Sequence, residues 1–238
     1  MEKGRERMGI LRNWTRFEIG WLFTFTLVNI YLFFAWSDSL IGLISSISGM
    51  LCVVLVAKGK ISNYYFGIVQ TLTYAYIAYG YGLYGEVMLN ALFYFPVQFI
   101  GIYLWKQNKT ENGVKGEDVK VNSLTKTGWI YTMVSILILT ICYGFFLKYL
   151  GGNNVWTDSA TNVLSIAAQI LMLRRFAEQW ILWISVNVLS IFLWLSALHS
   201  QGGNDFSMLV MWSAFLVNSL YGYINWRKLY VKQNQEVV

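Results

Sequence analysis

The sequence predicts an all-α polytopic membrane protein, and three observations lead to this fold class. The chain has 238 residues, of which 56% are hydrophobic and only 13% are charged, whereas soluble domains carry about 25% charged residues. The mean hydropathy is +0.47, and the apolar residues form continuous runs rather than the alternating pattern of transmembrane β-strands. Most runs have the roughly 17–25 residues that an α-helix needs to cross a bilayer.

Eight such runs follow one another along the chain, and the sixth is the shortest. They cover residues 17–34, 39–57, 62–80, 88–105, 128–148, 158–173, 180–198 and 206–226. The first run follows basic residues, as the apolar part of a signal peptide does. The next residues, AWSD, offer no small-residue cleavage site, so we expect this run to be retained as a helix.

Basic residues are distributed unevenly among the loops. With eight spans both termini lie on one side of the membrane, and that side carries all of the 18 Lys and Arg residues except Lys148. The opposite loops carry the acidic residues Asp38, Glu86, Asp158 and Asp205. Because basic residues mark the cytoplasmic side, both termini are expected there. The net charge of +6 then reports topology, and no nucleic-acid partner is needed to explain it.

The chain contains two similar halves. The segment YFGIVQ aligns with LWISVN when Gln70 is set on Asn187, and both segments follow a short basic turn. Further matches are Gly101 with Gly222, Trp105 with Trp226, and Lys106 with Arg227. These matches predict that one structural unit occurs twice.

Each unit contains three predicted spans, at residues 39–105 and 158–226. Three spans alone would invert the second copy, but the run 128–148 between the units restores its direction. Parallel three-helix repeats joined by one helix form the 3+1+3, seven-helix arrangement of SWEET-like transporters. The run 17–34 is then an additional N-terminal transmembrane helix.

This organisation divides the chain into six segments. The polar segment between the first repeat and the central helix is rich in Lys, Asn, Glu and Gly, so we expect a flexible linker with little to bury. The segments are the cytoplasmic N-terminus with the additional helix (1–37), the first repeat (38–106), the cytoplasmic linker (107–127), the linker transmembrane helix (128–149), the second repeat (150–228) and the cytoplasmic tail (229–238).

Polar and aromatic side chains recur at helical spacing in three of the predicted spans. Amides inside a membrane are costly unless they are paired, and they face other helices or a cavity. Interhelical hydrogen bonding is a sufficient explanation for Asn218 or Ser190 taken alone. Several amides beside aromatic rings near mid-membrane favour a shared pocket instead. The residues that this pattern selects are Phe66, Gln70, Asn90, Tyr94, Gln98, Trp180, Trp183 and Asn187.

The chemistry of these residues limits what the pocket can bind. Amides donate and accept hydrogen bonds, which suits hydroxyls and a carboxamide, and aromatic faces suit a flat ring, above all a cationic one. The middle of each predicted span lacks Lys, Arg, Asp and Glu, so a phosphate would find no partner. The expected substrate is a flat, hydroxylated, neutral or cationic molecule, a nucleoside rather than a nucleotide. The same absence argues against a proton relay and for movement down a gradient.

Catalytic, metal and cofactor chemistry is not indicated. His199 is the single histidine, and Cys52 and Cys142 lie in predicted spans without a CxxC motif. The segment GYGLYG (80–85) fits GxGxxG, but it joins two membrane spans rather than a strand and a helix. We therefore expect neither an enzyme nor a metal or cofactor site.

The chain has one proline, Pro96, inside the fourth predicted span. Proline removes a backbone hydrogen bond and bends a helix. The bend could act as a hinge or be fixed, and the sequence leaves both open.

Three segments resemble the PnuC family of bacterial nicotinamide riboside transporters: NALFYFPVQFIGIYLWK (90–106), YYFGIVQ (64–70) and QWILWISVN (179–187). The likeness covers residues 38–228. It implies an inner-membrane facilitator with a SWEET-like fold that passes nicotinamide riboside by alternating access, and a cytoplasmic kinase that traps the substrate by phosphorylation. It also implies a homotrimer.

The resemblance assigns roles to the selected residues. It implies substrate ligands at Gln70, Asn90, Gln98, Trp183 and Asn187, and ring faces or gates at Phe66, Tyr94 and Trp180. Related family members are thought to carry thiamine or riboflavin, so these vitamins remain alternative substrates. A binding subunit that needs a partner ATPase is another alternative.

Overall fold

The structure, a computed structural model, describes residues 14–35, 39–81, 83–110, 117–149, 155–201 and 206–235. Within these ranges the chain is helical, with two isolated β-bridges and no β-sheet, so the all-α class is confirmed. The elements are α2 (Arg16–Ala35), α3 (Leu40–Ala57), α4 (Asn63–Gly80), α5 (Tyr84–Met88), the π-helix η1 (Leu89–Tyr94), α6 (Phe95–Gln107), α7 (Lys126–Tyr149), α8 (Val155–Leu173), α9 (Gln179–Gln201) and α10 (Phe206–Gln235).

Six described segments are long and apolar enough to cross a membrane. They are Arg16–Ala35, Leu40–Ala57, Gly85–Gln107, Lys126–Tyr149, Gln179–Ser196 and Phe206–Gln235. Helices α4 and α8 have 18 and 19 residues, which is long enough, but they are not among the six. Both carry polar side chains, such as Gln70 in α4 and Gln169 in α8, and these lower their hydropathy.

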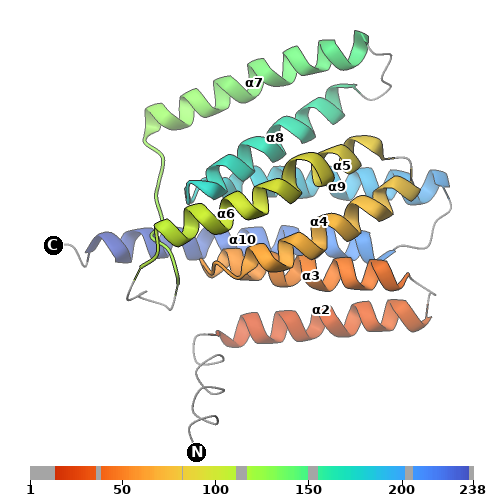
Figure 1. Cartoon of the computed structure of the whole chain (residues 1–238), viewed down its shortest axis with the longest axis horizontal. Coiled ribbons are helices and arrows are strands. Elements are labelled where there is room, and N and C mark those ends of the chain that lie inside the picture. The colour runs from red at the N-terminus through yellow and green to blue at the C-terminus, as the bar shows by residue number, and fades with distance from the viewer. Residues whose placement is uncertain are drawn as a thin grey trace, which may run out of the picture.

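The long helices lie side by side in one bundle (Figure 1). Helix α3 packs on α4 and α10, α9 packs on α10 and α8, and α6 packs on α4 and α8. Helices α2 and α7 lie at opposite edges of the bundle, where α2 packs on α3 and α7 packs on α8. Both edge helices leave large apolar side chains exposed, such as Phe34 on α2 and Leu137 on α7, as lipid-facing helices do.

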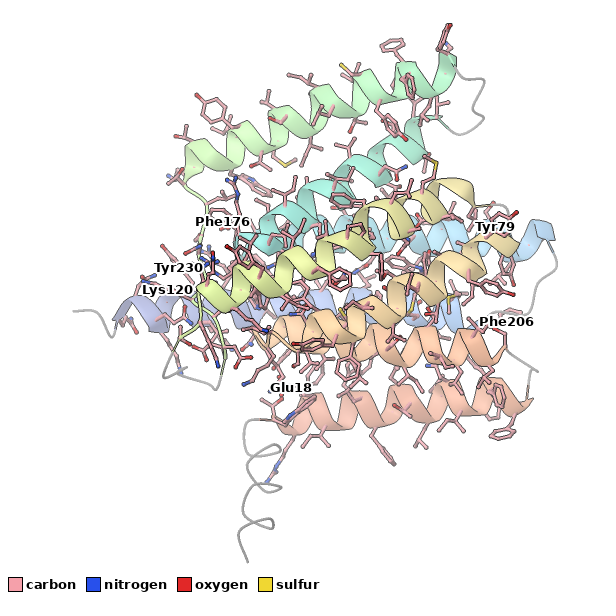
Figure 2. All side chains as sticks on the ribbon, viewed as in Figure 1. Glu18, Tyr79, Lys120, Phe176, Phe206 and Tyr230 are labelled. Carbon is pink, nitrogen blue, oxygen red and sulfur yellow. The ribbon has the colours of Figure 1, made fainter. Side chains whose placement is uncertain are left out.

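The α3–α4 and α8–α9 turns lie at one end of the bundle, where α2 begins and α10 ends (Figure 1). Figure 2 shows Glu18, Lys120, Phe176 and Tyr230 at this end, and Tyr79 and Phe206 at the opposite end. We call the first the basic end, because it also holds the α3–α4 turn with Lys58 and the α8–α9 turn with Arg174 and Arg175. Lys3, Arg5, Arg7 and Arg12, Asp38 and Asp205 lie outside the described residues.

The turns α3–α4 and α8–α9 repeat the same backbone geometry. Gly59 has φ 66° and Arg175 has φ 62°, so both turns place one residue in the left-handed region. The amides of residues 58, 59 and 60 bond the carbonyls of Val54, Val56 and Leu55, and those of residues 174, 175 and 176 bond the carbonyls of Ile170, Met172 and Leu171. Residues 58–60 are therefore equivalent to residues 174–176.

This equivalence corrects the register of the predicted repeat by one residue. Helices α4 and α9 continue without interruption from the two turns, so Gln70 is equivalent to Val186, and Thr71 to Asn187. The sequence alignment matched the two amides because their chemistry is alike, whereas the backbone places a threonine opposite Asn187.

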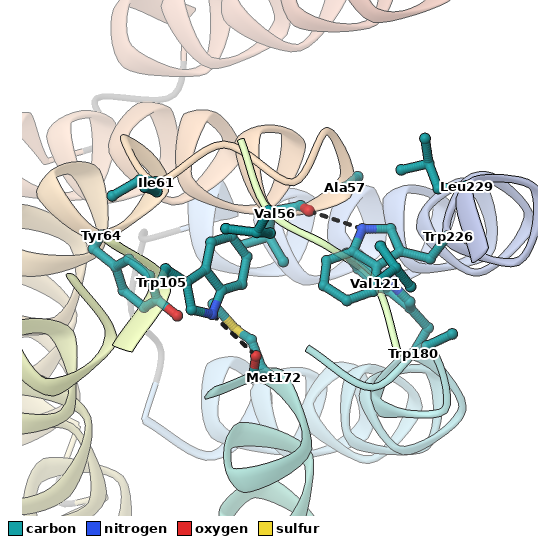
Figure 3. Packing of buried hydrophobic residues seen from close by; sticks show 12 residues of the cluster. Val56, Ala57, Ile61, Tyr64, Trp105, Val121, Met172, Trp180, Trp226 and Leu229 are labelled. Atoms are coloured by element: carbon teal, nitrogen blue, oxygen red, sulfur yellow. Dashed lines mark hydrogen bonds between the residues drawn. The ribbon is translucent and has the colours of Figure 1, made fainter. Parts of the chain in front are cut away.

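Two tryptophans join the halves reciprocally. The indole N–H of Trp105 in α6 donates to the carbonyl of Met172 in α8 at 3.2 Å, and that of Trp226 in α10 donates to the carbonyl of Val56 in α3 at 3.0 Å (Figure 3). Val56 and Met172 are equivalent positions in the two turns. The last helix of each half thus binds the end of the first helix of the other half, through a carbonyl that also accepts from the amide of its own turn.

Close helix contacts at the predicted glycine pair repeat in the same way. A Cβ atom at Gly101 would collide with the Tyr64 ring, and a Cβ atom at Gly222 would collide with the Trp180 ring. Tyr64 and Trp180 are equivalent positions after the two turns. Each glycine therefore lets an aromatic ring pack directly against the backbone of the last helix of its own half.

The prediction of a flexible linker with little to bury is wrong for residues 117–125. Val119 and Val121 are fully buried, because they pack in the apolar cluster around Trp105 and Trp226. Gln233 of α10 donates to the Glu117 carboxylate and accepts from the Val121 amide, both at 2.8 Å. Residues 111–116 lie outside the described residues.

The additional helix α2 is attached to both halves at the basic end. Glu18 and Thr15 form a reciprocal N-terminal capping box, with bonds of 2.7 and 3.1 Å. The Glu18 carboxylate also pairs with Lys58 at 2.7 Å and accepts from the Tyr221 hydroxyl at 2.9 Å. Lys58 belongs to the first half and Tyr221 to the second, so this buried carboxylate links three parts of the chain.

Candidate functional site

A cavity lies inside the bundle and is lined by residues of α3, α4, α5, η1, α6, α8, α9 and α10. The space among its side chains, including its opening, is about 860 Å³, within the usual range for small-molecule sites. Both halves contribute to the wall, whereas α2 and α7 do not. Because both halves form the wall, a movement of one half relative to the other would change access to the cavity.

The structure brings together seven of the eight residues selected from the sequence. Phe66 is half-buried in α4 but is not part of the wall. The seven that line the cavity are Gln70, Asn90, Tyr94, Gln98, Trp180, Trp183 and Asn187. Their convergence is a geometric finding, and their role as ligands stays a prediction.

Two of the amides are held by their own helix. The Asn90 side chain donates to the Glu86 carbonyl at 2.9 Å, and the Gln98 side chain donates to the Tyr94 carbonyl at 3.1 Å. Each amide has two N–H donors and one oxygen acceptor, so these bonds fix its orientation and leave capacity for another partner. Gln98 lies directly against Gly67, where a Cβ atom would collide with its carboxamide.

The amide of Asn187 joins two helices while it faces the cavity. It donates to the Ser219 hydroxyl at 2.8 Å, and Ser219 donates in turn to the Phe215 carbonyl at 2.8 Å. Asn218, in contrast, donates to the Val53 carbonyl at 3.0 Å and lies outside the wall, so interhelical bonding explains it as predicted. That explanation is wrong for Ser190, which lines the cavity and whose buried hydroxyl has no partner among the described residues.

The helix around Pro96 is irregular, and this irregularity shapes the wall. Residues 89–94 form a π-helix, and α6 begins at Phe95 with Pro96 in its first turn. A proline ring clashes with the carbonyl four residues earlier in an α-helix, and the wider π turn relieves this clash. Single π turns often occur at functional sites, and here the π turn carries Asn90 and Tyr94.

The aromatic wall has two different parts. The Tyr94 and Trp183 rings lie with centroids 6.3 Å apart and planes tilted by 41°. Trp180 is 2% exposed and packs edge-on against Trp226 at 6.1 Å, within the apolar cluster that Figure 3 shows. Tyr94 and Trp183 thus line the cavity as a pair of neighbouring rings, whereas Trp180 also packs in the apolar cluster at the basic end.

The sequence reasoning missed several residues of the wall. Glu86 was placed in an outer loop, but it lies in α5 and lines the cavity. Ser165 and Gln169 of α8 line it as well, and the buried Gln169 amide nitrogen has no partner among the described residues. Their spacing of four residues on one face of α8 was the available signal. Thr71 and Ser219 also belong to the wall.

The remaining sequence motifs do not form a second site. The segment 80–85 joins the end of α4 to α5, with Gly82 outside the described residues, so a helix rather than a strand precedes it. Within the described ranges, no group of three His, Cys, Asp or Glu residues could hold a metal ion. The cavity is therefore the candidate site.

Comparison with known proteins gives matches along nearly the whole chain. A family model described as nicotinamide mononucleotide transporter matches residues 39–228. The chain is 42% identical over 230 residues to the nicotinamide riboside transporter PnuC of Haemophilus influenzae, covering 97% of this chain and 98% of that protein. It is 42% identical over 217 residues to the protein of the same name from Neisseria mucosa, covering 91% and 82%.

A solved structure is also similar to this one. It is described as the crystal structure of the vitamin B3 transporter PnuC, and it superimposes with a TM-score of 0.85 at 41% sequence identity. The match covers 92% of this chain and 94% of the other. The bundle described above is thus the fold of that transporter.

Proposed function

Because the chain belongs to the nicotinamide mononucleotide transporter family, whose PnuC relatives are named for nicotinamide riboside, we propose that it transports nicotinamide riboside. The family places it among multi-pass transporters of the bacterial inner membrane and not among enzymes. One observation supports the proposal above all others: amides and aromatic rings from both halves face a single internal cavity.

The lining favours the riboside over the mononucleotide in the family description. Phosphate groups are bound in proteins by Arg, Lys or clustered backbone N–H groups. The described wall contains no Lys, Arg or His, and its one charged residue is Glu86. A phosphate would lose its hydration without gaining a cation, whereas the riboside brings a positive ring and hydroxyls that suit this wall.

The proposed contacts follow from the chemistry of the two partners. Tyr94 and Trp183 cover the faces of the pyridinium ring, because aromatic faces attract cations. The amides of Gln70, Asn90, Gln98 and Asn187 bind the carboxamide and the ribose hydroxyls. Trp180 closes the basic end of the cavity. Phe66, which lies outside the wall, is proposed as a gate rather than a ligand.

The proposed topology has eight spans, with a 3+1+3 SWEET-like core, an additional N-terminal helix and both termini in the cytoplasm. Helices α4 and α8 have the length of spans, and their polar residues face the cavity. The repeated turns support parallel three-helix units at residues 38–106 and 150–228, separated by the linker 107–127 and the helix 128–149. The described Lys and Arg residues of the turns gather at the basic end, which we assign to the cytoplasm.

The proposed mechanism is alternating access with facilitated diffusion. The wall is shared by two halves that exchange equivalent contacts, and repeats of this kind open alternately around a central site. One carboxylate without a lining Lys, Arg or His makes no proton relay. Phosphorylation of the riboside in the cytoplasm would then keep the gradient inward. We also propose that the chain forms a homotrimer, as the family resemblance implies.

Calorimetric titration of the purified chain with a vitamin panel tests the substrate. Nicotinamide riboside is expected to bind, and nicotinamide mononucleotide, thiamine and riboflavin are expected not to. Binding of thiamine or riboflavin without the riboside would replace the proposal by its alternative.

Uptake into proteoliposomes that hold only the purified chain tests the mechanism. Labelled riboside is expected to equilibrate without an ion gradient, and to accumulate when a riboside kinase and ATP are enclosed. If uptake requires an added ATPase, the chain is a binding subunit and not a facilitator.

A further inference from the structure

Glu86 is the charged residue of the cavity wall. It lies in the short helix α5, one turn before Asn90, and its carbonyl accepts the Asn90 side-chain N–H at 2.9 Å. A carboxylate in a largely apolar cavity is costly unless hydrogen bonds and an opposite charge compensate it. Its retention in the wall therefore calls for a physical reason.

Hydrogen bonding holds this carboxylate in place. The indole N–H of Trp194 donates to the Tyr74 hydroxyl oxygen at 2.8 Å, which leaves the hydroxyl proton of Tyr74 to donate to Glu86. Tyr94 interacts electrostatically with the same carboxylate. Trp194 and Tyr74 come from different halves, so Glu86 is positioned by the packing of the bundle and not by its own helix alone.

The opposite charge does not come from the wall. The described lining contains no Lys, Arg or His, and the Tyr74 hydroxyl supplies hydrogen bonding to Glu86 without positive charge. Among the described residues the wall thus has one acidic and no basic side chain, and its aromatic faces add a further preference for a cation. A cationic ligand would complete the site.

We propose that Glu86 is the charge-selecting residue of the cavity, which favours a cationic ring over an uncharged ring of the same shape. The inference rests on the proposed function, because the pyridinium ring of nicotinamide riboside is such a cation. Amides and aromatic faces alone would accept the oxidised riboside and its uncharged reduced form with similar affinity. Glu86 would separate the two.

The test compares these two ligands, which share the ribose and the carboxamide and differ in ring charge. Wild-type protein is expected to bind nicotinamide riboside more tightly than dihydronicotinamide riboside. The change E86Q is expected to weaken binding of the cation roughly ten- to hundredfold, the range for one charge–charge interaction at an intermediate dielectric constant. Binding of the uncharged form should change less than about twofold, and E86D should retain most of the discrimination.

A second carboxylate provides the matched control. Glu178 is buried at the basic end, where it accepts from Ser123 and Leu124 at 2.6 and 2.9 Å and does not line the cavity. E178Q is expected to leave the ratio of the two affinities unchanged, and the unfolding temperature of each variant shows whether it is folded.

The outcomes separate this inference from the proposed function. Equal weakening of both ligands in E86Q would make Glu86 a hydrogen-bond acceptor and overturn the inference, as would unchanged affinity for both. If E86Q does not fold, the ratio of the wild-type affinities for the oxidised and the reduced riboside decides. Similar affinities for these two ligands would also overturn the inference. Failure of wild-type protein to bind nicotinamide riboside at all would instead refute the proposed function.

Discussion

The two halves of the chain share their turns but differ in what they present to the cavity. Gly67 of α4 is equivalent to Trp183 of α9, and its lack of a side chain makes room for Gln98. In the second half the large ring of Trp183 lines the cavity together with the small Ser219, which occupies the position of Gln98. The first half thus combines a small residue on α4 with a large amide on α6, and the second half combines a large ring on α9 with a small residue on α10. This difference gives the cavity an amide-rich side and an aromatic side.

This difference separates the roles of scaffold and site. The turns, the two tryptophan bonds and the two glycine contacts repeat because they fix the packing of helices. The wall does not repeat, because a flat, asymmetric ligand needs different groups on its two sides. The same substitution at two equivalent scaffold positions should therefore change the stability by similar amounts. At two equivalent wall positions, only one of the two substitutions should weaken ligand binding.

Among the ring and amide variants, the largest effect is expected for Trp183→Ala, which removes the aromatic face of the second half. A desolvated cation–π contact contributes about 2 kcal/mol, so the affinity for nicotinamide riboside should fall roughly thirtyfold. Calorimetric titration measures the change. Phe99→Ala is the control, because this exposed ring of α6 lies outside the wall and its removal should leave the affinity unchanged. Equal losses in both variants would contradict the assignment of Trp183.

The equivalent positions Thr71 and Asn187 give the next effect. Asn187→Ala removes a side chain that can bond both Ser219 and a ligand, and the loss of about 1–1.5 kcal/mol corresponds to roughly a five- to tenfold weaker binding. The Thr71 hydroxyl already donates to the Ile68 carbonyl of its own helix at 3.2 Å, so Thr71→Ala should change affinity less than about twofold.

Titration of both variants with nicotinamide riboside checks this asymmetry, and Gln98→Ala should resemble Asn187→Ala. Unchanged affinity in Gln98→Ala and Asn187→Ala together would remove both amides from the set of ligands. A larger effect at Thr71 than at Asn187 would mean that the first half supplies the main contact.

A smaller and symmetric effect is expected for Trp105→Phe and Trp226→Phe. Each change removes one hydrogen bond to a helix-end carbonyl, which contributes about 0.5–1.5 kcal/mol to stability. Thermal unfolding in detergent should show similar losses for the two variants, with the riboside affinity retained. A loss confined to one variant would show that the repeated bonds are not equivalent in energy.

The sequence predicted those parts of the molecule that depend on long apolar runs or helical spacing. The expected helices agree with α2, α3, α4, α7, α8 and α9 to within a few residues, because a membrane span needs a minimum apolar length. Amides at helical spacing on three spans identified one face of each helix, and those faces do meet in the cavity. The extension of α10 to Gln235 escaped notice because its last turns are polar.

Features that depend on tertiary contact could not be predicted in this way. Glu86 was assigned to a loop because it lies between the predicted spans 62–80 and 88–105, and only the bonding to Tyr74 shows why a helix tolerates it there. Val119 and Val121 form too short a pattern to predict burial in a polar linker. The register of the repeat was off by one residue because Gln70 and Asn187 are alike in chemistry and not in position.

The smallest effect tests the repeated turn itself. Gly59 and Arg175 both have left-handed backbone angles, which cost residues other than glycine about 1–2 kcal/mol. Gly59→Ala should therefore destabilise the protein by about 1 kcal/mol, the more so because the new Cβ atom would lie 3.1 Å from the Glu117 side chain. Arg175→Gly relieves the same strain but removes the bond from its Nε atom to the Lys120 carbonyl at 3.0 Å.

The two contributions at Arg175 oppose each other, so the net change for Arg175→Gly should be within about 0.5 kcal/mol. Unfolding midpoints of the two variants measure the difference, and unchanged riboside affinity shows that the cavity is intact. Equal destabilisation by both changes would mean that the Arg175 bond outweighs backbone strain. The second turn would then be held by its contact with the linker, and the two halves would differ in their scaffold as well as in their site.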